Sequence, residues 1–233
     1  LHQAEQALAL RDRFISIASH ELKTPLTSIK GTAQLLLKLH AAGHLDLPRA
    51  MRSLQTIDSQ AARIGLLIDD MLDVSRIQSG RIELRKEPID LVTIVNGVVA
   101  ALPEETRDRV QLDLPATLPG QWDRLRLEQI VLNLLDNALK YSPSDEAVVV
   151  RLVRDADSAV LTVIDRGVGI PAADLPLLFR PFSRASNAAD HDVSGLGLGL
   201  YITRQIVEAH RGNVVVASSE GDGSTFTVRL PLG

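Results

Sequence analysis

The sequence predicts two domains of different class: an N-terminal helical hairpin, and a C-terminal α/β domain in which helices cover one face of a mixed sheet. Up to about Gly80 the apolar residues recur at alternating steps of three and four, which is the period of amphipathic helices. Beyond Gly80, short β-rich runs alternate with helical stretches. The change of period predicts a linker at residues 81–90, which contain Lys86, Glu87 and Pro88.

Two apolar stripes run through the first half of the chain. A pair of such helices buries little by itself, and the pairing of two copies into a four-helix bundle is the usual solution. We therefore predict a homodimer built on residues 14–80, with residues 1–13 as the end of a helix that enters from a longer protein. Pro25 is expected to interrupt and bend the first helix, and the polar stretch 40–48 to connect the two helices. The stripes contain Ile15, Ala18, Leu22, Pro25, Ile29, Thr32, Leu36 and Leu39, then Leu47, Ala50, Leu54, Ile57, Ala61, Ile64, Ile68 and Met71.

The second half, residues 91–233, has the alternation of an α/β domain. Three helices would be enough to cover one face of a mixed sheet. No internal repeat and no low-complexity tract occurs in the sequence. Strands are predicted at residues 147–153, 159–164, 213–218 and 224–230, and helices at residues 91–102, 124–141 and 200–211.

The composition narrows the classes of function. The 233 residues are 45% hydrophobic, which permits a core in each domain. With 25 basic and 29 acidic residues, the formal charge of −4 gives no positive field for nucleic acid. The absence of cysteine excludes disulfides and thiolate metal sites. No apolar run reaches the length of a membrane helix and no signal peptide opens the chain, so we expect this portion to be cytoplasmic, with a membrane anchor elsewhere in a longer protein left open.

His20 lies on the side of its helix away from the apolar stripe. If Ala18 and Leu22 are buried, residue 20 falls about 180° from the centre of the stripe and faces solvent. A neutral imidazole is a nucleophile, and a carboxylate that accepts a proton from one ring nitrogen activates the other, a role open to the adjacent Glu21. Thr24 lies one turn further along. Without other support, an exposed His-Glu pair is more often plain surface.

A polar face on the helix predicted at residues 124–141 is suited to a ligand. Asn133, Asn137 and Lys140 are spaced i, i+4 and i+7, away from the apolar residues of the same helix. Asparagine carbonyls suit Mg²⁺, and lysine supplies a point charge for phosphate. Surface helices also carry such residues routinely, so this face by itself is only suggestive.

Two glycine-rich elements follow. Asp165 ends a β-rich run and precedes Gly167 and Gly169, and its carboxylate could accept a hydrogen bond from an amine such as that of adenine. The run Ser194-Gly195-Leu196-Gly197-Leu198-Gly199 stands directly before a helix, where backbone N–H groups and the helix dipole favour phosphate. Its glycine spacing matches neither a P-loop nor a dinucleotide fingerprint. The stretch 185–194 between the two elements is predicted to be a mobile lid.

In order along the chain, these elements resemble the sensor histidine kinases of two-component signalling. Each motif alone is weak, but five in family order and spacing cover nearly the whole chain. They are Ser19-His20-Glu21-Leu22-Lys23-Thr24-Pro25-Leu26, Asn133-Leu134-Leu135-Asp136-Asn137-Ala138, Asp165-Arg166-Gly167-Val168-Gly169, Phe179 to Phe182, and Gly195 to Gly199, followed by Gly221-Asp222-Gly223-Ser224-Thr225-Phe226.

The resemblance implies a dimerisation and histidine-phosphotransfer hairpin, entered by a signalling helix and followed by a Bergerat-type ATP-binding domain like those of gyrase, Hsp90 and MutL. It implies ATP and Mg²⁺ as cofactors. The implied partners are a second copy of the chain, the receiver domain of a response regulator, and an upstream sensor domain. The implied activity is autophosphorylation of a histidine, followed by transfer to an aspartate of the regulator.

The resemblance also implies a role for each matching residue. His20 would accept the phosphoryl group, Glu21 would assist the proton transfer, Thr24 would orient water for phosphatase activity, and Arg184 would neutralise the γ-phosphate. Asn137 would bind Mg²⁺, Asn133 would support that site, and Asp165 would bind the adenine amine. The implied ATP-binding set is Asn133, Asn137, Lys140, Tyr141, Asp165, Gly167, Gly169, Gly195, Leu196, Gly197, Leu198, Gly199 and Thr225.

Two other readings compete with an autokinase. A gyrase- or Hsp90-like ATPase would make His20 incidental, but those relatives carry a water-activating glutamate four residues before the metal-binding asparagine, where this chain has Asn133. A dimeric module that relays conformational signals would need no intact nucleotide motifs. Transfer within one subunit and transfer between subunits both stay open, since the choice depends on the handedness of the connection at residues 40–48.

Overall fold

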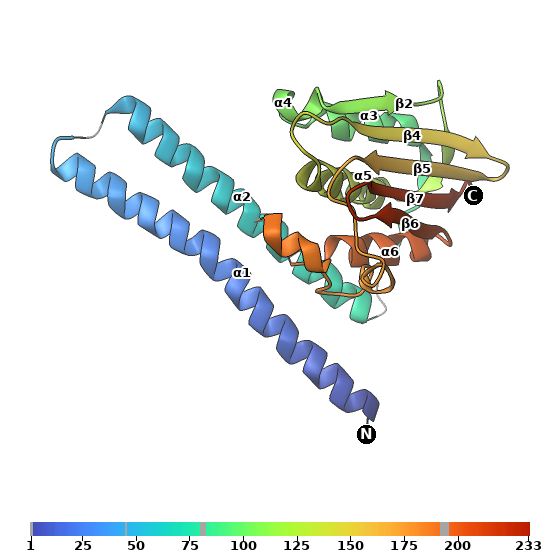
Figure 1. The fold of residues 1–233 in the computed structure, drawn as a ribbon, viewed down its shortest axis with the longest axis horizontal. Helices are drawn as coiled ribbons and strands as arrows, with labels where there is room; N and C mark the ends of the chain where they lie inside the picture. Colours follow the sequence, from blue (N-terminus) through green and yellow to red (C-terminus); the bar gives the residue numbers. More distant parts are fainter. Residues whose placement is uncertain (1, 45, 80–82, 192–195) are drawn as a thin grey trace. The chain divides into compact units, whose positions relative to one another are not determined.

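The computed structural model describes residues 2–44, 46–79, 83–191 and 196–233, shown in Figure 1. The chain divides into two compact units, residues 1–75 and 76–233. Within the described ranges no helix combines the length and apolarity that crossing a membrane requires.

The first unit is a hairpin of two long helices, α1 (His2–Ala41) and α2 (Leu47–Gln78), the second of which continues into the other unit. The prediction that Pro25 interrupts the first helix is wrong, because α1 continues through it. Pro25 has no N–H to donate to the carbonyl of Glu21, but this removes only one bond of the ladder. The turns on either side keep their bonds, so the helix persists.

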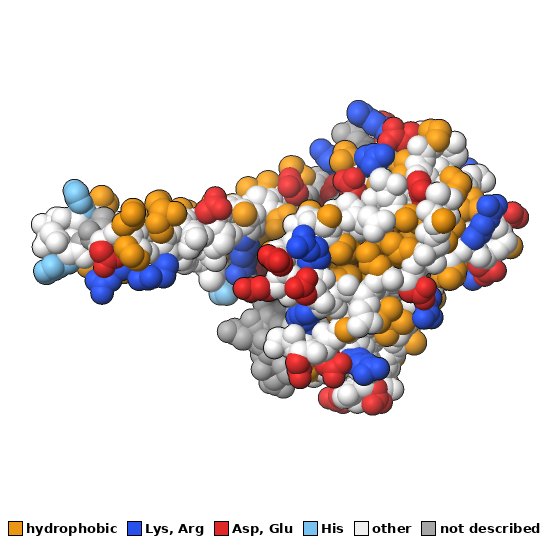
Figure 2. Space-filling model, turned by 90° about the horizontal axis from the view of Figure 1, so that it is seen from above, with side chains coloured by type: hydrophobic (Ala, Val, Ile, Leu, Met, Phe, Trp, Pro, Cys, Tyr) orange, Lys and Arg blue, Asp and Glu red, His pale blue; other side chains and the backbone are white. Residues whose placement is uncertain are grey.

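The hairpin covers only part of its apolar stripes. Ala18 of α1 and Leu67 of α2 are buried, and Ile57 and Ile64 of the predicted α2 stripe are half-buried. Other members of that stripe lie in solvent: Leu47, Leu54 and Ile68 expose 74%, 53% and 45% of their surface. Figure 2 shows hydrophobic side chains on the surface of this hairpin.

The second unit is built on a five-stranded sheet with the order β2-β4-β5-β7-β6. β2 pairs in parallel with β4, and the other neighbours are antiparallel, so the sheet is mixed as predicted. β2 was not predicted, because its four residues are too few to show an alternation. The strands are β2 (Val110–Asp113), β4 (Val148–Asp155), β5 (Ser158–Asp165), β6 (Asn213–Ser219) and β7 (Gly223–Pro231).

Three helices cover one face of this sheet, as Figure 1 shows. Along β5, Leu161, Val163 and Asp165 face these helices and are buried, because alternate side chains of a strand share a face. Leu134 and Leu135 of the middle helix have no exposed surface. The three helices are α3 (Leu91–Ala100), α5 (Arg124–Tyr141) and α6 (Gly199–Ala209). The unit also contains the short helices α4 (Glu104–Arg107), η1 (Leu175–Leu177) and η2 (Ser186–His191).

Part of the predicted linker 81–90 belongs to the second unit. β1 (Glu87–Asp90) pairs antiparallel with β3 (Pro119–Trp122) in a small separate sheet. Pro88 and Gly120 weaken the sequence signal of both strands, but a two-stranded edge tolerates them. Asp90 ends β1 and caps α3, and its carboxylate accepts hydrogen bonds from the N–H groups of Val92 and Leu118.

Candidate functional site

His20 is displayed on α1, as the helical period predicts. Its side chain is 81% exposed. The Nδ1 atom lies 3.6 Å from Oε1 of Glu21, an ion-pair distance, which leaves Nε2 directed away from the carboxylate. A lone pair on Nε2 is the nucleophile of an imidazole protonated on Nδ1.

Glu21 has a second partner that sequence reasoning missed. Its Oε2 lies 3.5 Å from Nη2 of Arg63 on α2, and both side chains are less than a third exposed. Arg63 therefore links the two helices and restrains the carboxylate beside His20. The two residues are 42 positions apart, so no local pattern could have revealed the pair.

Thr24 is placed one turn after His20, as predicted, and is exposed. Its hydroxyl donates a hydrogen bond of 3.3 Å to the carbonyl oxygen of His20. Because Pro25 cannot donate to Glu21, the backbone at this turn has an acceptor without its helical partner. The exposed Thr24 and the half-buried Glu21 are thus the polar side chains next to His20 on α1.

In the second unit, α5 presents the predicted polar face. The Nδ2 atom of Asn133 donates to the carbonyl of Gly199 at 3.2 Å and to Oγ1 of Thr203 at 3.4 Å, so this side chain ties α5 to α6. Asn137 is half-buried, and among the described residues no side chain or backbone group bonds to its amide. Lys140 forms an ion pair with Asp136 on the exposed side of the helix.

Asp165 is buried at the end of β5. Its Oδ1 accepts hydrogen bonds from the N–H groups of Gly167 at 2.9 Å and Ser224 at 3.2 Å. No donor from the described residues binds Oδ2. Burial raises the pKa of Asp165 above its ordinary value, and the hydrogen bonds from Gly167 and Ser224 oppose that rise. Oδ2 is thus an acceptor without a donor from those residues, on a side chain that is 5% exposed.

The turn after Asp165 needs its glycines because other backbone comes close. A Cβ on Gly167 would collide with the carbonyl oxygen of Tyr141, which also accepts the N–H of Val168. Gly169 has φ = +65°, and a Cβ there would collide with the carbonyl of Ser219. The turn therefore packs directly against the C-terminal end of α5, where Tyr141 lies.

Strand register distinguishes Ser224 from Thr225. Asp165 pairs with Ser224 and Ile164 pairs with Thr225, and directly opposed residues share a face. Ser224 therefore lies on the helix-covered face beside Asp165. Thr225 lies on the opposite face, with Ile164 and Ala217. A hollow of about 560 Å³ at this end of the strands is bordered by residues of both faces, Asp165 and Ser224 as well as Ile164 and Thr225. The predicted Thr225 is thus turned away from the Asp165 side chain, and Ser224 was missed. The alternation of β7 could have found it.

The second glycine element opens α6. Gly197 has φ = +66°, and a Cβ there would lie 2.6 Å from the carbonyl of Ser183. The side chains of Leu196 and Leu198 are buried, so only their backbone could meet a ligand. Leu198 caps the helix without a side-chain hydrogen bond, and α6 begins at Gly199. The predicted Gly195 lies outside the described residues.

The segment before this element is anchored at several points. Phe182 is buried at φ = +62°, and its N–H donates to the carbonyl of Gly197. Asn187 donates to the carbonyl of Gly169 at 3.1 Å. The N–H and hydroxyl of Ser186 both donate to Asp174, and these bonds lower the pKa of that carboxyl. Arg184 is exposed. Ser186 and Asn187 of the predicted lid thus contact Asp174 and the Gly169 turn, and residues 192–194 of that lid lie outside the described residues.

Arg109 supports the far end of α5 and was also missed. Its guanidinium donates to the carbonyls of Leu139, Ser142, Pro143 and Glu146, at 3.4, 3.3, 2.6 and 3.3 Å. A cation at a helix C-terminus is favoured by the helix dipole. Arg109 therefore holds the turn that follows Tyr141.

Comparison with known proteins matches both halves of the chain. Residues 10–80 match the family described as the His Kinase A (phospho-acceptor) domain. Residues 122–233 match the family described as histidine kinase-, DNA gyrase B-, and HSP90-like ATPase.

Individual relatives agree with these matches. The circadian input-output histidine kinase CikA of Synechococcus elongatus is 36% identical over 98% of this chain and 31% of its own length. The mycobacterial sensor histidine kinase MprB is 30% identical over 63% of this chain and 97% of the solved chain, with a TM-score of 0.54. Histidine kinase ThkA, solved in complex with response regulator protein TrrA, is 21% identical, with a TM-score of 0.67 over 98% of this chain and 64% of its own. The chain spans about a third of the length of the first curated relatives it matches.

Proposed function

This chain belongs to the sensor histidine kinases, and we propose that it uses ATP to phosphorylate His20 and then passes the phosphoryl group to an aspartate of a response regulator. The observation that carries the proposal is the exposed imidazole of His20, with Nδ1 turned toward Glu21 and Nε2 away from it. Residues 122–233 match a family of ATPases, which supports ATP as the phosphoryl donor.

The chemistry at His20 follows from the two ring nitrogens. Nε2 attacks the γ-phosphorus of ATP while the bond from that phosphorus to the β–γ bridging oxygen breaks, which releases ADP. The ring becomes more acidic as it gains the phosphoryl group, and Nδ1 passes its proton to Glu21. Arg63 keeps the carboxylate beside the ring but shares its charge, so Glu21 is a restrained and moderate base.

The second unit offers groups for each part of ATP. We assign Oδ2 of Asp165 to the adenine amine, with Ser224 beside it in place of Thr225. Tyr141 and the Gly167–Gly169 turn would border the base. The backbone of residues 195–199 and the first N–H groups of α6 would hold the phosphates. Lys140 would exchange Asp136 for phosphate, and Arg184 would neutralise charge on the γ-phosphate.

Asn137 fits a Mg²⁺ that is bound mainly by phosphate oxygens. Its amide oxygen is a hard ligand without a partner among the described residues. Over those same residues no three His, Cys, Asp or Glu side chains gather as metal ligands. Mg²⁺ usually binds through one or two protein groups plus nucleotide phosphates, so one asparagine is sufficient. The metal would neutralise phosphate charge, and Asn133 would keep α6 in place nearby.

Asn133 also argues against a water-hydrolysing ATPase. Its side-chain NH₂ donates to the carbonyl of Gly199 and to Thr203, so it is engaged as a donor. An amide cannot accept a proton from water as a carboxylate does. Without such a base nearby, the histidine is favoured as the acceptor of the phosphoryl group.

The exposed stripe of α2 supports a homodimer. Leu47, Leu54 and Ile68 recur at heptad spacing, and a second hairpin would cover them in a four-helix bundle. We propose the receiver domain of a response regulator as the second partner, a class of protein that ThkA binds in its solved complex. An upstream sensor domain would occupy part of the additional length of the relatives. We propose a cytoplasmic location for the chain, because the activity proposed for it would use ATP.

Labelling with γ-labelled ATP and Mg²⁺ tests the central claim. We expect an acid-labile, alkali-stable phosphate on the protein and its complete loss in His20→Gln. His44→Gln, an equal change at an exposed histidine of the hairpin connection, should label like the wild type. Label that persists in His20→Gln would overturn the assignment. Asn137→Ala should lose labelling through loss of Mg²⁺–ATP, and unchanged nucleotide affinity in that variant would refute the metal role.

The phosphatase activity is a separate part of the proposal. The hydroxyl of Thr24 lies one helical turn from His20 and is exposed, so it can orient a water at the phosphoaspartate of the regulator. Thr24→Ala should slow dephosphorylation of the regulator and leave labelling of His20 largely intact. Equal loss of both activities would contradict a selective role.

A further inference from the structure

A buried histidine outside the proposed site joins the two helices that build it. His210 is the C-cap of α6 and has 1% of its surface exposed. Its Nε2 accepts the backbone N–H of Asp123, the N-cap of α5, at 3.1 Å. Its Nδ1 lies 2.9 Å from the carbonyl of Ile206. A ring that accepts at Nε2 and faces a carbonyl at Nδ1 must be neutral and protonated on Nδ1.

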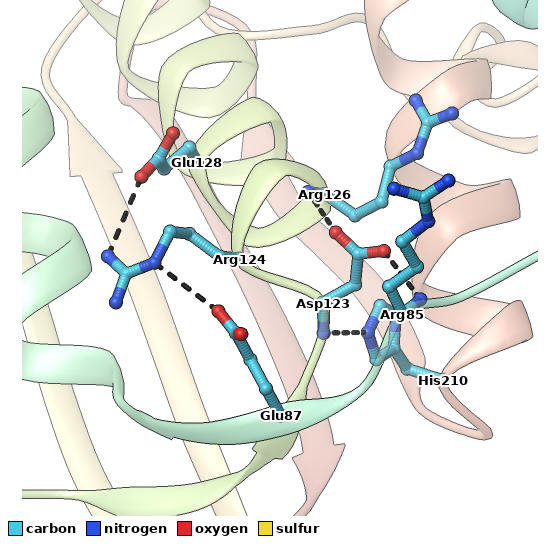
Figure 3. Close-up of polar contacts among 7 residues, drawn as sticks. All are labelled: Arg85, Glu87, Asp123, Arg124, Arg126, Glu128 and His210. Carbon is cyan, nitrogen blue, oxygen red and sulfur yellow. Dashed lines mark hydrogen bonds and ion pairs between the residues drawn. The ribbon is translucent and has the colours of Figure 1, made fainter.

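Asp123 forms hydrogen bonds with three parts of the chain: His210, the first turn of α5 and the segment before β1, as Figure 3 shows. Its Oδ1 accepts the N–H of Arg126 in the first turn of α5 at 3.1 Å, and its Oδ2 accepts the N–H of Arg85 at 2.8 Å. Arg85 lies just before β1. The N-terminus of α5, the C-terminus of α6 and the segment that leads into β1 therefore meet at one buried cluster.

Polar contacts thus join α6 to α5 at both ends of α6. Asn133 of α5 holds Gly199 and Thr203 at the start of α6, and the contact of Asp123 with His210 holds the other end. The exit from α6 is also constrained, because Arg211 adopts φ = +63° and the N–H of Gly212 donates to the carbonyl of Val207. A helix tied at both ends cannot slide along its neighbour.

We infer that His210 is a positioning residue for the nucleotide site: as the Nδ1-protonated neutral ring it fixes α6 against α5, and protonation of Nε2 releases that tie. The inference rests on the proposed ATP site, because α5 carries Asn137 and the start of α6 faces the phosphates in that proposal. A protonated ring would set its Nε2–H against the N–H of Asp123. The carboxylate of Asp123 already accepts from Arg85 and Arg126, so it cannot compensate fully.

The electrostatic surroundings agree with this geometry. Burial lowers the pKa of His210 below its ordinary value; the bond to Ile206 raises it, the charge of Lys86 lowers it and that of Asp123 raises it. The hydrogen bond from the N–H of Asp123 to Nε2 of His210 is thus fully formed above about pH 6.5, the ordinary pKa of histidine. It is lost as the pH falls through the lower folded-state pKa.

The test measures binding of a fluorescent ATP analogue to the full chain from about pH 8, above the ordinary histidine pKa of about 6.5, down to the lowest pH at which circular dichroism shows the chain folded. Three variants are compared with the wild type. His210→Gln keeps an acceptor near the Nε2 position but cannot titrate, and His210→Leu removes the acceptor. His44→Gln is the control at an exposed histidine. Because the nucleotide phosphates titrate in the same range, only the difference between wild type and His210→Gln is interpreted.

At about pH 8 we expect His210→Gln to bind like the wild type and His210→Leu to bind roughly tenfold more weakly, the value of one lost buried hydrogen bond. At low pH the wild type should weaken roughly tenfold more than His210→Gln, which is again the loss of that bond. Wild-type affinity in His210→Leu at pH 8, or equal pH dependence in wild type and His210→Gln across the pH range in which His210 titrates, would overturn the inference. Failure of the wild type to bind nucleotide at pH 8 would instead refute the proposed function.

Nitrogen NMR of the imidazoles gives a readout that does not depend on nucleotide or on a folded variant. The resonance missing from His210→Gln, or assigned through bonds in the wild type, should show an unprotonated Nε2 at neutral pH. It should titrate below the ordinary histidine pKa. A protonated Nε2 at neutral pH would exclude the assigned tautomer and with it the inference.

Discussion

In the hairpin, long apolar side chains such as Leu47 and Leu54 lie mostly in solvent, whereas in the second unit Leu134, Leu135 and Val163 have no exposed surface. Both regions are rich in apolar residues. They differ in where the covering surface comes from, since the second unit encloses its core with its own sheet and helices. The hairpin does not cover these side chains by itself. With the second copy that we propose as their cover, its stability should depend on protein concentration and that of the second unit should not.

The largest expected effect comes from removing that external cover. The double variant Leu54→Glu/Ile68→Glu should dissociate the dimer, because four apolar side chains per dimer lose burial worth at least about 4 kcal/mol, or roughly a thousandfold in dissociation constant. Light scattering after gel filtration measures the mass. Leu125→Glu changes a leucine of α5 that is more exposed than either of these residues, and it should leave the dimer intact. An unchanged mass for the double variant would refute the dimer face.

The second-largest effect is expected from a substitution in the core of the second unit, which that unit covers by itself. Leu134→Ala should lower the free energy of unfolding of the second unit by about 3 kcal/mol, since it opens a cavity among fully buried side chains. Trp122, the single tryptophan, is buried in β3 and reports on this unit in urea. Leu54→Ala should leave the tryptophan transition unchanged. Similar losses from both substitutions would contradict the contrast between the two regions.

Asp165 sharpens the comparison because it is an ionisable group inside the enclosed core. Its folded-state pKa is raised, so its favourable contribution to stability is present below the ordinary value of 3.8 and is lost as the pH rises through the folded-state pKa. At pH 7 Asp165→Asn should therefore be no less stable than the wild type. It should nevertheless bind nucleotide roughly tenfold more weakly, because an amide N–H could face the adenine amine.

Urea unfolding and nucleotide titration of the same Asp165→Asn sample separate these two effects. A variant that loses stability and affinity together at pH 7 would show that the carboxylate is structural and would contradict its role toward adenine.

The smallest expected effect is in the hairpin. Arg63→Met should slow phosphorylation of His20 by roughly threefold, because a partly exposed ion pair contributes less than about 1 kcal/mol. Nucleotide affinity of the second unit should not change. Arg63→Lys, which keeps the charge, should recover part of the rate. If Arg63→Met labels at the wild-type rate, the restraint on Glu21 has no catalytic value.

Much of this molecule could be predicted from local patterns. The helix at residues 124–141 was predicted with its observed bounds, and the strands of the sheet from β4 onward were predicted to within two residues at either end, since each shows its own period. β1, β2 and β3 were missed because four residues hold too few alternations. Pro25 misled the prediction because the cost of one proline is smaller than the sum of the bonds around it.

The candidate site likewise combines features that local patterns predict with contacts that they do not. The sequence by itself determined that His20 faces solvent, that Asn133 and Asn137 share a face, and where the glycine turns fall, because helical period and turn chemistry are local. Only the tertiary structure decided that Arg63 restrains Glu21, that Ser224 rather than Thr225 lies beside Asp165, and that His210 meets Asp123. These contacts join residues 42, 59 and 87 positions apart. Packing and strand register decide such contacts, and no local period carries that information.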